Sequence, residues 1–93
     1  MLGMIESFRD KGLRELFETG RSNRVPSELR KRVIERLDAL HAARTVVDLD
    51  RPGFAFHALK GTNRCAISVD GPWRITFEWT SGRAYRVDLE QYH

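Results

Sequence analysis

The sequence has few of the features that mark secreted, membrane-spanning or metal-binding proteins. Cys65 is the only cysteine among the 93 residues, so they can form no internal disulfide and hold no paired-cysteine metal motif. No apolar run approaches the roughly 20 residues of a membrane-spanning helix, and no segment resembles a signal peptide. His41, His57 and His93 lack the spacing of zinc ligands. We therefore expect a cytoplasmic domain that uses neither a metal nor another cofactor.

Lysine is also scarce. The 16 basic residues comprise 13 arginines and only three lysines, against 13 acidic residues, and the net charge is +3. Arginine binds phosphate through a planar pair of N–H groups and stacks on bases. Six of the basic residues fall between Gly20 and Arg36. This composition favours a polyanionic partner. Arginine-rich codon usage with a well-solvated helix surface explains it equally well.

Two helices are expected in the first half of the chain. Residues 5–8 alternate in polarity and could form a short strand before the first helix. Leu13, Leu16 and Phe17 then share one helical face. Gly20 suits the left-handed conformation that often ends a helix, so we expect the first helix to stop there.

The second helix has the strongest periodic signal. Pro26 is expected at its first position, where a missing N–H costs nothing. The neighbours Arg32 and Arg36 repel one another weakly, which indicates a solvated surface or, alternatively, a surface turned toward RNA. His41 in the last turn suits the helix dipole and is expected to be structural. The apolar stripe of this helix consists of Leu29, Val33, Leu37 and Leu40.

After Pro52-Gly53 the apolar period changes to two, which is typical of strands. Turn residues at 70–72 and 81–82 separate the later alternating segments, so an antiparallel meander is expected. We expect Tyr85 to face the helices and Arg86 to face away from them. Cross-strand ion pairs would give such arginines a purely structural role.

Together these patterns predict an α+β fold in which two N-terminal helices pack on a small antiparallel sheet. We expect one domain over residues 1–93. Residues 1–3 precede a second methionine, Met4, and are expected to be an extension, either from an upstream start or added artificially.

Four short motifs occur in a fixed order along the chain. They are MIESF at residues 4–8, HALKG at residues 57–61, WRITF at residues 73–77 and YH at residues 92–93. In this order and at these separations they resemble the HigB (plasmid host-killer) toxins. These toxins belong to the RelE-like superfamily of type II toxin–antitoxin systems. The resemblance extends from residue 4 to residue 93.

The resemblance implies a microbial-RNase-like fold whose concave sheet face carries the catalytic groups. It implies a metal-independent endoribonuclease that cleaves messenger RNA in the ribosomal (30S) A site and inhibits translation. It also implies three partners: the ribosome, messenger RNA and a HigA-like helix-turn-helix antitoxin.

Carried over by position, the family's catalytic residues fall on His57, Lys60, Arg74, Tyr92 and His93. In such a reaction the ribose 2′-OH attacks the adjacent phosphorus and expels the 5′-oxygen. We expect His57 or His93 to donate a proton to that oxygen. Lys60 and Arg74 would hold the scissile phosphate, and Tyr92 would stack on or orient the substrate.

Further basic residues are expected to contact RNA or the ribosome. Arg64 or Arg86 would contact flanking phosphates. The chain also departs from the family pattern, because Gln91 replaces an acidic residue and Asp70 a basic one. The complete set of expected RNA- or ribosome-binding residues is Arg64, Arg86, Arg21, Arg24, Lys31 and Arg32.

Two other functions remain open at the level of sequence. A basic RNA- or ribosome-binding module could inhibit translation without cutting the message. A plain interaction protein could use the helices to dock a partner. Cleaved RNA ends that carry a 5′-OH would distinguish the nuclease from both alternatives.

Overall fold

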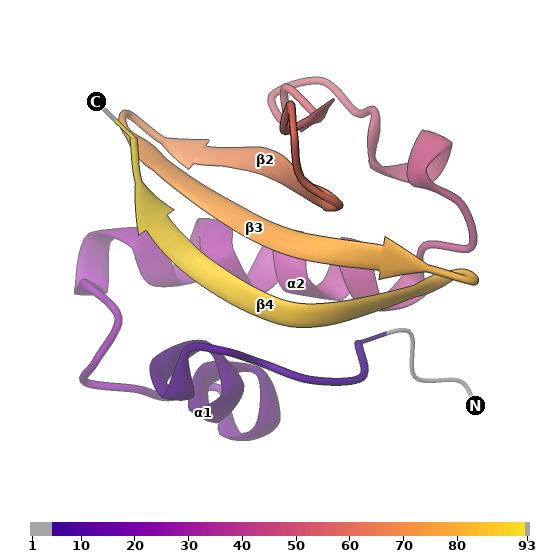
Figure 1. Ribbon diagram of the computed structural model, residues 1–93. Coiled ribbons are helices and arrows are strands. Elements are labelled where there is room, and N and C mark those ends of the chain that lie inside the picture. Colours follow the sequence, from indigo (N-terminus) through magenta and orange to yellow (C-terminus); the bar gives the residue numbers. More distant parts are fainter. Residues whose placement is uncertain (1–4, 93) are drawn as a thin grey trace.

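The computed structural model describes residues 5–92 as two helices packed on a four-stranded antiparallel sheet, which confirms the predicted fold class. In Figure 1, α2 lies behind the sheet, and no helix of the described chain covers the near face. The expected extension at residues 1–3 and the expected catalytic His93 lie outside the described residues. The elements are α1 (Lys11–Thr19), η1 (Ser27–Leu29), α2 (Arg30–Ala42), η2 (Val46–Leu49), β1 (His57–Ala58), β2 (Arg64–Asp70), β3 (Trp73–Thr80) and β4 (Arg83–Gln91).

Helix α1 begins and ends at residues suited to those positions. The Asp10 carboxylate accepts a hydrogen bond of 3.0 Å from the Leu13 N–H and so caps the first turn. Gly20 has φ +79°, and its N–H donates to the Leu16 carbonyl over 2.8 Å. The predicted end of this helix is therefore confirmed, with glycine in the left-handed conformation.

Helix α2 begins later than predicted. Pro26 precedes the 3₁₀ turn η1, and the α-helix starts at Arg30. The predicted stripe of Leu29, Val33, Leu37 and Leu40 is confirmed, since each is at most 2% exposed. Within residues 5–92, no helix is both long enough and apolar enough to cross a membrane.

Arg36 is the main exception to the predicted surface of α2. The sequence pattern favours a solvated position, but only 8% of the side chain is exposed. Its guanidinium donates to the Ser68 carbonyl over 2.6 Å and to the Gly53 carbonyl over 3.4 Å. It also lies 4.8 Å from the centre of the Phe54 ring. Arg36 follows Val33 by three positions, so it falls on the buried stripe and joins α2 to β2.

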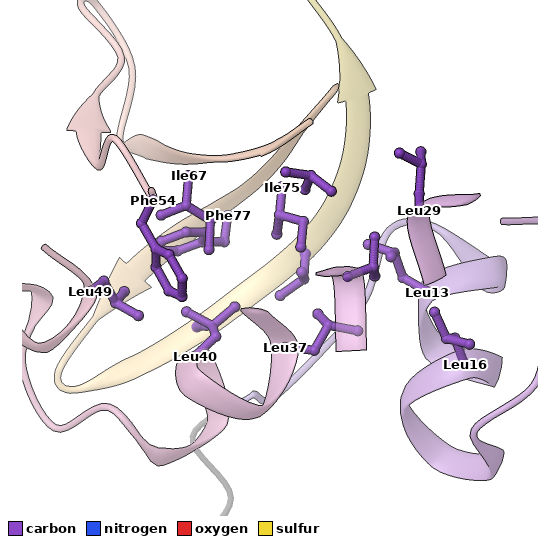
Figure 2. Close-up of a cluster of buried hydrophobic side chains, with 14 of the residues drawn as sticks. Leu13, Leu16, Leu29, Leu37, Leu40, Leu49, Phe54, Ile67, Ile75 and Phe77 are labelled. Atoms are coloured by element: carbon purple, nitrogen blue, oxygen red, sulfur yellow. The ribbon is translucent and has the colours of Figure 1, made fainter. Parts of the chain in front are cut away.

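The core lies between α2 and one face of the sheet (Figure 2). Leu37 and Leu40 of α2 lie toward Ile75 and Phe77 of β3. Leu49 and Phe54 lie at one end of this layer in the picture, and the α1 residues lie at the other. Burying such side chains is the main stabilising contribution to a chain of this size.

Strand β1 is shorter than the alternation from residue 54 predicts. It contains two residues, and His57 pairs with Ala66 of β2. Gly53 and Ala55 both have positive φ, at +86° and +46°, so the chain turns where the pattern predicts an extended strand. The two later hairpins are confirmed, because β2–β3 and β3–β4 turn at the predicted positions.

A β-bulge in β4 changes which residues face the helices. Arg86 has φ +52°, and the register with β3 shifts between Thr76 and Glu78. Tyr85 therefore lies opposite Glu78 on the polar face, and Ala84 is the buried neighbour. The prediction that Tyr85 faces the core is wrong, because one extra residue reverses the alternation.

The segment before α1 lies beside β4 (Figure 1, indigo). Ile5 and Phe8 form isolated parallel bridges with Ala84 and Val87. The Val87 N–H donates to the Ser7 carbonyl over 3.0 Å. The predicted strand at residues 5–8 is thus reduced to two bridges along the outer edge of the sheet.

Candidate active site on the open face of the sheet

The sheet face opposite α2, here called the open face, gathers most of the polar strand residues. Residues that pair across neighbouring strands share a face, so the register assigns each residue to one side. Tyr92 extends this set, because its N–H donates to the Pro72 carbonyl over 2.7 Å. The open face consists of His57, Arg64, Ala66, Ser68, Arg74, Thr76, Glu78, Tyr85, Asp88, Glu90 and Tyr92.

His57 and Lys60 come from the outer strand and the turn after it. Both residues are exposed. His57 Nδ1 lies 3.1 Å from the Ala55 carbonyl oxygen. A carbonyl only accepts hydrogen bonds, so the geometry assigns the proton of the neutral ring to Nδ1. Nε2 is then the ring nitrogen left to act on a substrate.

Arg74 and Tyr92 meet at the β2–β3 hairpin. The Arg74 guanidinium donates to the Gly71 carbonyl over 2.7 Å and to the Trp73 carbonyl over 3.0 Å. Since Tyr92 bonds to the same turn through Pro72, the structure brings these two predicted catalytic residues together at one end of the open face.

The Tyr92 phenol remains protonated at neutral pH. Burial raises its pKa above the usual value, and the charge of Glu90 raises it further. Arg64 and Arg74 act in the opposite direction, with smaller effect. The hydroxyl can therefore donate a hydrogen bond to a substrate oxygen.

Arg64 lies inside the polar layer, with 11% of its side chain exposed. Its guanidinium donates to Thr76 Oγ1 and to the Arg86 carbonyl, each over 2.9 Å. It also lies 3.5 Å from a carboxylate oxygen of Glu78. These bonds show Arg64 joining β2, β3 and β4, whereas contact with a flanking phosphate stays a prediction.

The other predicted RNA-binding residues are spread over the molecule. Arg86 lies at the bulge with 67% of its side chain exposed, 3.7 Å from Glu78. Arg32 of α2 forms a 2.9 Å ion pair with Asp70 beside the hairpin. Arg21 and Arg24 line a surface pocket in the loop after α1, and Lys31 is exposed on α2. These helix-side residues therefore do not join the open face.

Two residues of the open face, Thr76 and Glu90, were assigned no role in the site from the sequence. Thr76 is fully buried, and its hydroxyl donates to the Glu90 carboxylate while accepting from Arg64. The period of two places both residues on the polar face, because Thr76 lies between the outward positions 74 and 78 and Glu90 precedes Tyr92 by two, but it does not show their contact. Among residues 5–92, no group of three or more His, Cys, Asp or Glu side chains could hold a metal ion.

Comparison with known proteins identifies the family. The family model described as "RelE-like toxin of type II toxin-antitoxin system HigB" matches residues 6–93. The chain is 40% identical over 92 residues to Endoribonuclease HigB of Proteus vulgaris, covering 97% of this chain and 100% of that protein. It is 31% identical over 93 residues to Toxin HigB-1 of Vibrio cholerae serotype O1, covering 96% and 98% respectively. The predicted resemblance is confirmed, and the chain belongs to the HigB-like family of RelE-like toxins of type II toxin–antitoxin systems.

Proposed function

We propose that this protein is an endoribonuclease toxin that cleaves messenger RNA in the ribosomal A site and so inhibits translation. The observation that carries the proposal is the joint anchoring of Arg74 and Tyr92 at the β2–β3 hairpin, on the open face of the sheet. The Arg74 guanidinium is held by two backbone carbonyls, and the Tyr92 main chain is anchored to the same turn, so both residues keep their positions when a substrate binds. The full-length likeness to a protein named Endoribonuclease HigB supports the same activity.

The chemistry requires two proton transfers and the stabilisation of charge on phosphorus. The bond from the ribose 2′-oxygen to phosphorus forms as the bond to the 5′-oxygen breaks. The products are a 2′,3′-cyclic phosphate and a 5′-OH. Arg74 and Lys60 stabilise the phosphorane-like transition state, and Tyr92 donates a hydrogen bond to it or stacks on a base. His57 acts as the acid in its imidazolium form, in which Nε2 carries the second ring proton, and Nε2 donates that proton to the leaving 5′-oxygen. A catalytic role for His93 stays a prediction.

Membership of a type II toxin–antitoxin family implies an antitoxin partner. We extend this to a HigA-like helix-turn-helix antitoxin, and to the small ribosomal subunit as the site of action in the cytoplasm. Exposed Arg21, Arg24 and Lys31 provide positive charge on the helix side for ribosomal RNA, apart from the open face.

Primer extension on a defined message in a reconstituted translation system tests the proposal. Reactions with and without ribosomes would compare the wild type with His57→Ala and Arg74→Ala. We expect discrete cuts within translated codons, 5′-OH ends and dependence on the ribosome. Each variant should lose about 100-fold or more in rate. Val47→Ser, at a side chain exposed to solvent on η2, serves as the matched surface control. Stalled synthesis with an intact message would instead identify a non-cleaving inhibitor.

A further inference from the structure

The last strand divides its residues between the two sheet faces. Gln91 pairs with Trp73, so it belongs to the face that carries the helices. Glu90 pairs with Arg74, and Tyr92 follows it by two positions, so both belong to the open face. The carboxylate nearest to Tyr92 along this face is therefore that of Glu90. An acidic residue at position 91 would lie on the other side of the strand.

Glu90 is held by a directed chain of hydrogen bonds. An Arg64 N–H donates to Thr76 Oγ1 over 2.9 Å, and the Thr76 hydroxyl donates to Glu90 Oε2. A hydroxyl has one proton, and arginine can only donate, so the threonine proton must point at the carboxylate. Because Thr76 is fully buried and Arg64 is largely buried, the chain fixes the position of the carboxylate. Within residues 5–92, the second oxygen, Oε1, makes no hydrogen bond.

Glu90 and Arg74 are cross-strand partners that do not form an ion pair. Opposite charges at such positions usually attract one another. Here Arg74 donates to the carbonyls of Gly71 and Trp73, whereas Glu90 accepts from Thr76. The Glu90 carboxylate and the Arg74 guanidinium thus lie on neighbouring strands without neutralising each other in an ion pair. Attack on phosphorus requires this combination, with a base beside the bound phosphate.

We infer that Glu90 is the general base of the reaction and that Thr76 and Arg64 are its positioning residues. Glu90 takes the proton of the ribose 2′-OH as the 2′-oxygen bonds to phosphorus, and it returns this proton to solvent after product release. The 5′-oxygen leaves with a proton from the general acid. Within residues 5–92, the candidate for this acid is His57. The inference rests on the proposed endoribonuclease function. It assigns the role of base to a carboxylate, whereas the sequence alone suggests that His57 and His93 share the roles of acid and base.

Glu90→Gln separates catalysis from structure, because the glutamine carbonyl can still accept from Thr76 but the side chain cannot act as a base. We expect the single-turnover rate of ribosome-bound message cleavage to fall about 100- to 10,000-fold, with unchanged ribosome affinity and unfolding midpoint. Asp88→Asn is the matched control. It removes a carboxylate two residues away on the same strand, whose ion-pair partner is Arg9 at 3.7 Å. This control should cut within about twofold of the wild type.

The positioning role has its own test. Thr76→Val removes the hydroxyl and should lower the turnover rate about tenfold or more without raising KM, whereas Thr76→Ser should restore it. Wild-type cleavage by Glu90→Gln, or an equal loss in Asp88→Asn, would overturn the inference and leave the endoribonuclease proposal standing. Absence of cuts by the wild type under the same conditions would overturn both.

Discussion

The two faces of the sheet are built from alternate residues of the same strands, yet one face forms the core and the other carries the candidate site. Toward α2, Ile67, Ile75 and Phe77 are completely buried and have no polar atoms to satisfy. On the open face most of the neighbouring side chains are ionic or hydroxylic, and Arg64 donates a hydrogen bond to the Thr76 hydroxyl. Core residues and polar residues thus alternate along each strand. A change in register by one position would move each set to the opposite face of the sheet.

This comparison predicts that substitutions on the two faces have separable effects. A change toward α2 should lower the free energy of unfolding and affect cleavage only through folding. A change to one of the proposed catalytic residues of the open face should lower the cleavage rate while the protein stays folded. The predictions below run from the largest expected change in free energy to the smallest.

Phe77→Ala should have the largest effect on stability. Among residues 5–92, Phe77 is the largest fully buried side chain, and its truncation leaves a cavity between β3 and α2. We expect the free energy of unfolding to fall by about 3–5 kcal/mol. Urea denaturation followed by tryptophan fluorescence measures the change, with Phe77→Leu as the conservative control. A loss below about 1 kcal/mol would contradict the description of this face as close-packed.

Arg74→Ala should have the opposite profile. Its guanidinium bonds only carbonyls of the adjacent hairpin among the described residues, so its loss should change the free energy of unfolding by less than about 1 kcal/mol. The cleavage rate should fall about 100- to 1,000-fold, because the variant lacks the preorganised positive charge that stabilises the transition state. Parallel denaturation and primer-extension measurements check both halves. Unfolding of the variant would show that Arg74 is structural instead.

Arg36→Met tests an arginine that is buried on the helix side. The substitution keeps most of the apolar stem but removes the donors to Ser68 and Gly53. Two backbone carbonyls then lose a partner, and we expect a loss of about 2 kcal/mol in the free energy of unfolding. Arg32→Met, four residues earlier and half exposed, should cost under about 1 kcal/mol in the same experiment. Equal losses would remove the distinction between the two positions.

Asp88→Asn should have the smallest effect, and it depends on pH. Burial raises the pKa of the Asp88 carboxyl, and the Leu89 N–H and Arg9 only partly oppose this shift. Because the folded pKa lies above the unfolded one, the wild type loses stability as pH rises from the unfolded value through the folded value. The asparagine variant lacks this loss. Its free energy of unfolding relative to the wild type should therefore be higher at pH 7 than at pH 3, by about 0.5 kcal/mol or less. Denaturation at both pH values measures this difference. A variant that is more stable than the wild type only at pH 3 would contradict the predicted direction.

The sequence predicted those parts of the fold that depend on local patterns. The stripe on α2, the left-handed Gly20 and the two hairpins follow from periodicity and turn chemistry, which neighbouring residues determine. The wrong face for Tyr85 and the shortened β1 have another origin. Both depend on a positive φ, at Arg86 and at Ala55 respectively, and neither residue type signals such a conformation.

The candidate site divides in the same way. Arg74 and Tyr92 were predicted from motifs, and the structure places them at one hairpin. The contact between Thr76 and Glu90 was missed because it joins two strands, and no motif contains both residues. The burial of Arg36 could have been predicted, since its spacing from Val33 places it on the apolar stripe.

The contact between residues 5–9 and β4 has a consequence for the order in which the molecule folds. Ser7 and Arg86 are hydrogen-bonded across 79 positions, so the segment synthesised before all other described elements docks on the strand synthesised after them. Closing so long a loop is entropically costly, and contacts of this separation form late. Strand β4 also carries Glu90 and leads into Tyr92. A nascent chain therefore completes its outer edge and its candidate site in one step, when this strand joins the sheet.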